Sequence, residues 1–291
     1  MTAEELIKQG KVDEALAALK AEVKAKPAEP GLRVFLFQLL AINGDWERAL
    51  TQLNVASEMD GQHMLMTHLC RPALQAEAFR REVFSGARSP MLFGEPEPWM
   101  GWLVQANAYF AKGQFDAAVD LRDKAFEAAP AIPGNVNGQP FQWFSDMDGR
   151  MGPMLEAMID GKYYWLPLCR VRQILMEPPA GLRDLIWAPA TMVLANGGQV
   201  PALLFARYPG SEKSPDALVR LGRKTDWVDH ECGISTGLGQ RMLAGDASEH
   251  ALLEIRSFVQ DIQVPAGAEG GDAAGGAAGQ AGGEAGGKGV G

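Results

Sequence analysis

The stretch Gly44-Asp-Trp-Glu-Arg-Ala-Leu50 has two close copies in this chain, Gly10-Lys-Val-Asp-Glu-Ala-Leu16 and Gly113-Gln-Phe-Asp-Ala-Ala-Val119. The first two glycines are 34 residues apart, and the second and third are 69 apart, close to two further periods. A period of 34 residues is typical of tetratricopeptide-like repeats, in which each unit is a pair of helices. The spacing therefore indicates stacked helix pairs.

The repeated positions have distinct roles in a helix pair. The glycine permits the left-handed turn that ends the first helix. An alanine five residues later (Ala15, Ala49, Ala118) lets the second helix pack closely on its neighbour. A helix breaker follows 17 residues after each glycine: Pro27, Gly61, Pro130. We therefore predict a tetratricopeptide-like α-superhelix over residues 1–130, with a plain α-helical bundle as the alternative.

The stretch between the second and third copies is less regular. His63–Phe84 has the apolar spacing of a helix, in which Pro72 must kink or start the helix. Ser89–Pro98 is rich in proline and glycine and is expected to be a loop.

Residues 131–264 change character and predict a small α+β domain with short antiparallel strands. Strand patterns occur at Lys162–Leu168, Thr191–Ala195 and Val200–Phe205, and Asn196-Gly-Gly-Gln199 between the last two indicates a hairpin. Short helices are expected at these ranges: Gly152–Asp160, Arg170–Met176, and Ser248–Gln260 with Ser248 as N-cap. There are too few parallel βαβ units for a doubly wound fold.

Composition limits the class of partner. The 291 residues are 47% hydrophobic and 22% charged, the balance of a globular protein, and the net charge is −9. The 27 basic residues are spread among 36 acidic ones, without the basic clusters that bind nucleic acid or an anionic membrane. The longest apolar run, Val34–Ile42, is far shorter than the ~20 residues of a spanning helix. We expect no nucleic-acid partner and no membrane insertion.

The chain ends and the cysteines bear on location. The acidic start Met1-Thr-Ala-Glu-Glu5 is unlike a secretory signal. Three cysteines far apart in the sequence (Cys70, Cys169, Cys232) indicate reduced thiols and a cytoplasmic protein. Residues 265–291 are almost all glycine and alanine, and we expect a flexible tail there because they offer little apolar area to bury.

A hydrolase reading rests on Gly233-Ile-Ser-Thr-Gly237, which matches the G-x-S-x-G nucleophile elbow. Ser235 would need an acid and a histidine later in the chain, and only Asp246 and His250 could serve. Too few residues follow to complete a hydrolase sheet, so a glycine-rich turn is the favoured interpretation.

A metal-enzyme reading rests on Asp146-Met-Asp148. The favoured interpretation is a turn in which both aspartates accept backbone amides and pair with Arg150. The four histidines (His63, His68, His230, His250) lack the spacing of a structural zinc site, and there is no phosphate-binding G-x-x-x-x-G-K-[ST] loop. We expect no metal, no cofactor and no catalytic residue.

The second half also contains a long ordered series of motifs. They are Phe141-Gln-Trp-Phe-Ser-Asp-Met-Asp-Gly-Arg-Met-Gly-Pro-Met-Leu-Glu156, Asp160-Gly-Lys-Tyr-Tyr-Trp-Leu-Pro167, Gly181-Leu-Arg-Asp-Leu-Ile-Trp-Ala-Pro189, Arg207-Tyr-Pro-Gly-Ser-Glu212, Lys224-Thr-Asp-Trp227 and Gly239-Gln-Arg241. This series resembles the ImpE family, also called SciE or TagJ, of bacterial type VI secretion accessory proteins. The resemblance covers residues 1 to about 262 and leaves the Gly/Ala tail outside.

The resemblance implies a non-enzymatic interaction protein. Members of the family bind a helical segment of the small sheath subunit, TssB, and so link the contractile sheath to ClpV, the ATPase that recycles it. Stacked helix pairs suit such a partner because they leave a concave groove. Aromatic and arginine side chains are the usual anchors of an interface. The candidates are Trp143, Arg150, Tyr163, Tyr164, Trp165, Arg183, Trp187, Arg207, Tyr208 and Trp227.

Several of these candidates have a structural alternative. Most tryptophans of a small domain belong to its core, and Arg183 with Asp184, or Arg207 with Glu212, could form structural ion pairs. Four methionines at helical spacing are expected to form one helix face that packs inward, with an adaptable partner surface as the alternative: Met147, Met151, Met154, Met158.

Overall fold

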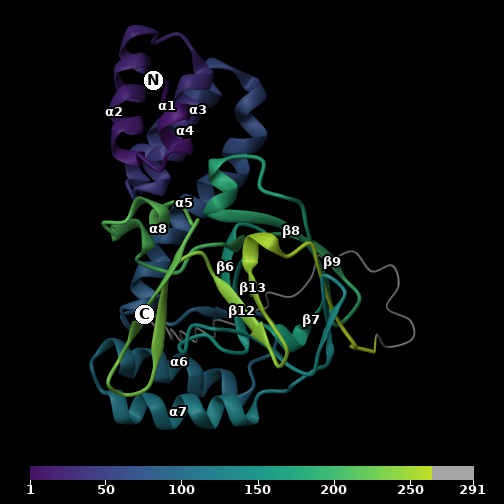
Figure 1. Cartoon of the computed structure of the whole chain (residues 1–291). Helices are drawn as coiled ribbons and strands as arrows, with labels where there is room; N and C mark the ends of the chain where they lie inside the picture. Colours follow the sequence, from purple (N-terminus) through teal and green to yellow (C-terminus); the bar gives the residue numbers. More distant parts are fainter. Residues whose placement is uncertain (264–291) are drawn as a thin grey trace, which may run out of the picture.

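The computed structural model describes residues 1–263. Helices fill the first half, with α1 to α4 stacked at one end, α6 and α7 at the other end, and the long α5 between them (Figure 1). The α-helices of the described range are α1 (Ala3–Lys8), α2 (Val12–Ala25), α3 (Pro30–Ile42), α4 (Trp46–Met59), α5 (Met64–Phe84), α6 (Pro98–Ala111), α7 (Phe115–Ala128) and α8 (Ala217–Arg220). The 3-10 turns are η1 (Gly61–His63), η2 (Leu168–Arg170), η3 (Leu182–Leu185), η4 (Ser211–Lys213) and η5 (Leu252–Glu254).

The repeat prediction is confirmed at all three copies. Gly10, Gly44 and Gly113 have φ angles of 76°, 73° and 72°, and each ends the first helix of a pair. This left-handed conformation is easy only for glycine, because it has no Cβ. Alanine 15, 49 and 118 are fully buried where the second helix packs on its neighbour. The pairs are α1 with α2, α3 with α4, and α6 with α7.

Helix α5 interrupts this series. A further period from Gly44 would bring a turn glycine to position 78, but Ala78 lies inside α5, which continues to Phe84. Pro72 also lies inside α5 rather than at its start. The consequence is one long helix that joins the α1–α4 stack to the sheet.

The second half is built on a nine-stranded sheet in the order β1-β6-β5-β9-β8-β7-β14-β2-β3. Only β1 and β6 are paired in parallel; the other neighbours in this sheet are antiparallel. A three-stranded sheet, β13-β12-β4, and a hairpin, β10-β11, complete it. The strands are β1 (Met91–Leu92), β2 (Gly134–Val136), β3 (Gln139–Phe141), β4 (Phe144–Asp146), β5 (Met154–Ile159), β6 (Lys162–Pro167), β7 (Val171–Met176), β8 (Trp187–Leu194), β9 (Gln199–Phe205), β10 (Thr225–Asp229), β11 (Ser235–Gly239), β12 (Met242–Gly245), β13 (Glu249–Ala251) and β14 (Ser257–Gln260).

The α+β class and the three predicted strands are confirmed, including the hairpin of β8 and β9. The three predicted helices are wrong. Residues 152–160 hold β5, residues 170–176 hold β7, and residues 248–260 hold β13, η5 and β14, so Ser248 caps no helix. All six residues of β5 are buried, so the strand shows no alternation, and a mostly apolar run without alternation has the same appearance in a strand and in a buried helix.

The methionine cluster is therefore not a helix face. Met154 and Met158 lie on β5, Met151 lies in the preceding turn, and Met147 follows β4. The predicted inward packing is correct for three of them, since Met151, Met154 and Met158 are at most 5% exposed.

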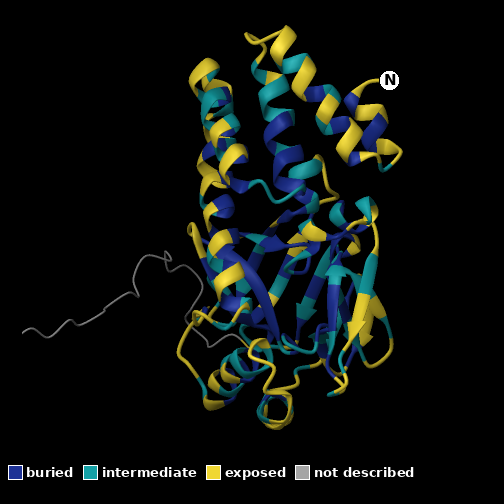
Figure 2. Cartoon of the chain, turned by 90° about the vertical axis from the view of Figure 1, so that its left-hand side faces the viewer, coloured by how far each residue is buried: buried dark blue, intermediate teal, exposed yellow. Residues whose placement is uncertain are grey.

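One core cluster connects the helices with the sheet. It includes Phe37 of α3, Leu74 of α5, Trp165 of β6, Trp187 of β8 and Phe205 of β9. A second cluster lies within the sheet half of the molecule. In Figure 2 most strands are coloured as buried or intermediate, and the helical stack stands above them. The predicted division into domains at residue 130 stays a prediction, and the predicted tail lies outside the described residues. Within residues 1–263 no helix has both the length and the apolar character needed to cross a membrane.

Candidate functional site

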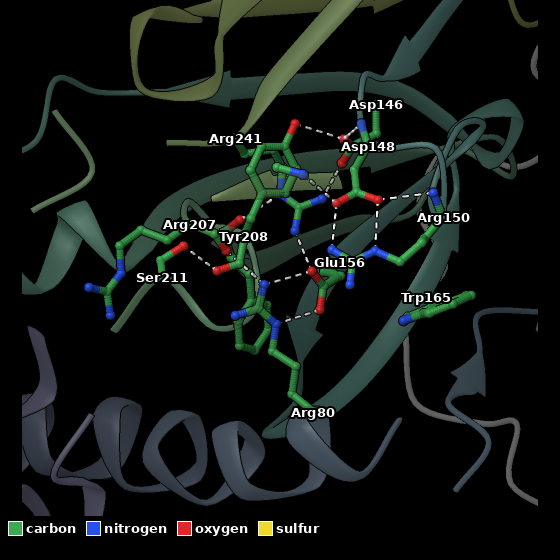
Figure 3. A network of polar contacts seen from close by, with 12 residues as sticks. Arg80, Asp146, Asp148, Arg150, Glu156, Trp165, Arg207, Tyr208, Ser211 and Arg241 are labelled. Carbon is green, nitrogen blue, oxygen red and sulfur yellow. Dashed lines mark hydrogen bonds and ion pairs between the residues drawn. The ribbon is translucent and has the colours of Figure 1, made fainter. Parts of the chain in front are cut away.

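A buried network of charged side chains lies where α5 meets the sheet (Figure 3). At its centre Glu156 of β5 is fully buried and accepts hydrogen bonds from two arginines. Arg80 of α5 donates through Nε and Nη2 at 2.6 and 2.7 Å, and Arg241 donates through Nη2. The Tyr163 hydroxyl adds a further bond of 2.5 Å. Residues from three distant parts of the sequence thus meet on one carboxylate.

The network continues into the turn after β4. Asp146 pairs with Arg241 and accepts the Tyr208 hydroxyl at 3.0 Å. Asp148 accepts three bonds from Arg150, through the backbone nitrogen at 2.9 Å, Nε at 2.9 Å and Nη2 at 2.6 Å. The backbone nitrogen of Asp148 donates to Asp146 at 2.8 Å. The predicted turn and its Arg150 pair are therefore confirmed for Asp148, whereas the expected Arg150 pair of Asp146 is wrong because Asp146 pairs with Arg241.

The carboxylates of the network differ in the direction in which their pKa values are shifted. Burial would raise the pKa of Glu156, but Arg80 and Arg241 outweigh burial and hold the pKa at about 2. Burial dominates at Asp146 and raises its pKa to about 6, although Arg241 opposes the shift. Burial also raises the pKa of Glu77, whose carboxylate accepts the Trp187 indole at 3.0 Å. Glu156 is thus the firmly ionised anion on which the buried arginines converge.

Arg207 joins the helical stack to the sheet half. Its Nη1 donates to the backbone oxygen of Ile42 at 3.0 Å, at the end of α3. Its own backbone oxygen accepts from Arg80 Nη2 at 2.7 Å. Burial lowers the pKa of Arg207 to about 10. No Arg207–Glu212 ion pair is present among the described residues, whereas the predicted Arg183–Asp184 pair is present at 3.0 Å.

The nucleophile reading of Ser235 has no support in the geometry. The Ser235 hydroxyl donates to Asp229 at 2.5 Å across the β10–β11 hairpin. Asp246 accepts the backbone nitrogen of Gln142, and His250 lies 2.7 Å from the Ser248 hydroxyl. The structure therefore does not assemble Ser235, Asp246 and His250, because each is engaged elsewhere.

Metal-ligand chemistry has equally little geometric support. The carboxylate oxygens of Asp146 and Asp148 accept hydrogen bonds from arginines, a tyrosine and backbone amides. Among residues 1–263 no three histidine, cysteine or acidic side chains are grouped in a way that could hold an ion. The three cysteines of this range are unpaired.

The ten predicted partner-binding residues fall into two groups. Five are buried at 3% exposure or less and belong to the core or the network: Tyr163, Trp165, Trp187, Arg207 and Tyr208. The other five reach the surface to different extents: Trp143, Arg150, Tyr164, Arg183 and Trp227. Trp143 and Trp227 are the most open of the tryptophans in the described range, at 42% and 36% exposure. Buried side chains cannot contact a partner without unfolding, so the surface candidates reduce to the second group.

Trp143 lines an apolar cleft of about 350 Å³ between α6, α7 and the sheet. Trp99 and Phe126 form its helical wall, and Pro153 and Leu168 lie on the strand side. Phe126 is itself 37% exposed. The cleft is thus a concave apolar surface with an exposed tryptophan at its edge, the arrangement that interface anchors favour.

The sequence reasoning missed Arg80 and Glu77 of α5. Glu156 and Arg241 lie within the quoted motifs, whereas Arg80 and Glu77 belong to none of them. The signal that could have found Arg80 and Glu77 is their position on the apolar side of α5, next to Ala76 and Val83, where a charged residue needs a partner.

The fold and its site define a helical-repeat protein with an α+β second half. Buried ion pairs join the stacked helices to the mainly antiparallel sheet of that half. The family model of the ImpE protein matches residues 138–259. The type VI secretion system accessory component TagJ of Pseudomonas aeruginosa is 45% identical over 258 residues, which cover 89% of this chain and 90% of that protein. The crystal structure of protein VPA1032 from Vibrio parahaemolyticus has the same fold, with a TM-score of 0.81, 22% identity and coverage of 89% of this chain and 97% of that one.

Identity at this level over most of both chains shows the family. The chain belongs to the ImpE family of type VI secretion accessory components.

Proposed function

We propose that this chain is a non-enzymatic adaptor that captures a helical segment of the small type VI sheath subunit, TssB. Through that contact it links the contractile sheath to the ClpV-type recycling ATPase, in the cytoplasm. The observation that carries the proposal is the 45% identity with an accessory component of this secretion system over 89% of the chain.

The Trp143 cleft supports this proposal as the place where the helix docks. An amphipathic helix buries apolar side chains spaced three and four residues apart, and it needs a concave apolar surface to do so. The cleft offers such a surface, with Trp143 and Phe126 still exposed. Burying an aromatic anchor of this kind contributes about 2 kcal/mol or more to an interface.

A co-sedimentation experiment tests the adaptor role. Assembled sheath and the ATPase are mixed with and without this chain, and the ATPase in the sheath pellet is measured. We expect the chain to bind the sheath and to increase the sedimented ATPase. If the chain stays in the supernatant, the proposal is wrong.

Matched tryptophan variants test the docking place. Trp143→Ala is expected to weaken sheath binding at least tenfold. Trp227→Ala removes the other exposed tryptophan among the candidates, which lies on β10 and does not line the cleft, so docking in the cleft predicts unchanged binding for that variant. Leu65→Asp with Leu69→Asp examines the exposed leucines of α5, which are 71% and 45% exposed. Loss of binding only in that double variant would reject the Trp143 cleft.

The enzymatic alternative, a small hydrolase or metal-dependent enzyme, makes a different prediction. Ser235→Ala removes only the hydrogen bond to Asp229, so we expect unchanged stability and unchanged sheath binding. Asp148→Asn keeps the shape of the turn but weakens its Arg150 pair, and should change stability alone. A measured turnover that either variant abolishes while the fold persists would contradict the adaptor role.

A further inference from the structure

A second cavity, of about 210 Å³, lies at the junction of the helical stack and the sheet half. The start of α4, the C-terminal part of α5, the turn after β4 and the segment 209–213 each contribute to its wall. It is separate from the Trp143 cleft, with which it shares no lining residue.

More basic than acidic side chains line this cavity, although the chain as a whole is acidic. Four basic side chains line it against two acidic ones, Glu77 and Glu212. Glu77 is paired with Arg80 at 3.4 Å and accepts the Trp187 indole, so the protein itself already uses its carboxylate. The aliphatic stem of Glu212 packs at the α3–α4 turn, where a Cβ on Gly44 would lie 2.4 Å from its Cγ.

The basic groups are only partly used by the protein itself. Arg80 is committed to Glu156, and Arg150 gives Nε and Nη2 to Asp148. Within residues 1–263, Arg150 Nη1 and the side chains of Arg81 and Lys213 have no hydrogen-bond or ion-pair partner. Three donors from three separate segments therefore border one cavity and remain available to a ligand.

The rest of the wall favours binding of an anion. The Phe84 ring lies under the guanidinium groups of Arg80 and Arg150, at 5.9 and 4.9 Å from its centroid. Trp46 and Pro209 add apolar surface to the wall. Low-dielectric walls strengthen the attraction between a charge and its counter-ion. Guanidinium groups match the oxygen spacing of carboxylate and phosphate groups.

We propose that this cavity is an oxyanion-binding site, in which Arg81, Arg150 and Lys213 hold a carboxylate or phosphate group against Phe84. The cavity has room for several water molecules, at about 30 Å³ each, and so for a group of that size. The site does not depend on the helix-docking proposal, because the two surfaces are distinct. Its occupation would add a negative charge where α4, α5 and the 209–213 segment meet, and would tighten that junction.

Thermal unfolding of the full chain tests the site with two probes. Inorganic phosphate represents a free oxyanion, and a capped peptide with one glutamate represents a carboxylate of a protein partner; sodium chloride at equal ionic strength and a capped glutamine peptide are the controls. We expect at least one probe to raise the unfolding temperature above its control. A shift with phosphate alone assigns a free anion, and a shift with the glutamate peptide alone assigns a partner carboxylate.

Charge-matched variants then locate the effect. Arg81→Gln with Lys213→Gln removes two exposed, unpaired cations and leaves the buried network intact, so the double variant should fold. Its dissociation constant for the active probe is expected to rise at least tenfold. Lys20→Gln with Lys24→Gln on α2 makes the same charge change elsewhere and should have no effect. If neither probe shifts unfolding beyond its control, or if the cavity variant binds like the α2 variant, the proposal is wrong.

Discussion

At the scale of single residues, Glu156 is the carboxylate on which two buried arginines of the network converge. A buried carboxylate is costly unless it is paired and hydrogen-bonded, and here Arg80, Arg241 and Tyr163 satisfy it together. Removing one partner of such a group leaves the others charged and unpaired, which is more damaging than losing an exposed ion pair. Glu156 therefore holds α5 on the sheet, because its loss would leave two buried arginines without their carboxylate partner.

Replacing Glu156 with Gln should lower the free energy of unfolding by about 3 kcal/mol at neutral pH. The folded-state pKa of Glu156 is lowered from 4.5 to about 2, so its stabilising contribution is complete above pH 4.5 and is lost as the pH falls towards 2. Urea unfolding of both proteins between pH 2 and pH 7 measures this. The gap between them should shrink over that acid range; a gap independent of pH would contradict the pairing.

At the scale of elements, the helix-pair turns differ in what surrounds their glycines. Gly113 has open space where a Cβ would project, whereas a Cβ on Gly44 would lie 2.4 Å from Glu212 Cγ. Both have positive φ, so alanine is strained at either site by about 1–2 kcal/mol. Only the second turn also contacts the 209–213 segment, and this contact ties the helical stack to the sheet half.

Gly44→Ala should therefore destabilise the protein more than Gly113→Ala. We expect a loss of about 1 kcal/mol for Gly113→Ala, from backbone strain alone, and roughly twice that for Gly44→Ala because Glu212 must also move. Denaturant unfolding of the two variants under identical conditions provides the comparison. Equal losses would show that the Glu212 contact contributes nothing.

The elements also show what the sequence could and could not predict. The 34-residue spacing identified three helix pairs because glycine and alanine have fixed steric roles in each pair. It could not identify the strand β5, whose residues are buried on both faces and carry no alternation. The strand β7, for which the pattern predicts a helix, has only partly alternating burial along its six residues. Local pattern fails where tertiary burial on both sides of a sheet determines the conformation.

In the candidate site, too, the sequence predicts local contacts but not contacts between distant segments. Asp148 and Arg150 are two residues apart, and their pairing followed from turn chemistry. Arg80 and Glu156 are 76 residues apart in sequence, so their contact depends on how α5 lies on the sheet. Four of the seven aromatic residues predicted for a partner surface are core residues, because composition does not tell which side of a strand a ring occupies.

At the scale of the whole molecule, the helical stack and the sheet share one apolar cluster and one ion-pair network. Such shared burial couples the stability of the two parts, unlike a flexible linkage between independent domains. Differential scanning calorimetry should therefore show a single transition for the full chain, with matching calorimetric and van't Hoff enthalpies. Two separated transitions would show that α5 does not join the parts energetically.

The central claim, capture of a sheath helix by a preformed surface, is tested most directly by titration calorimetry. The helical segment of the small sheath subunit is titrated into the full chain, with a scrambled peptide of equal composition as the control. We predict one-to-one binding with a dissociation constant between about 1 and 100 µM and a negative heat-capacity change from apolar burial. The account is contradicted if the chain is folded and neither the peptide nor the intact sheath subunit gives binding heat at either of two temperatures.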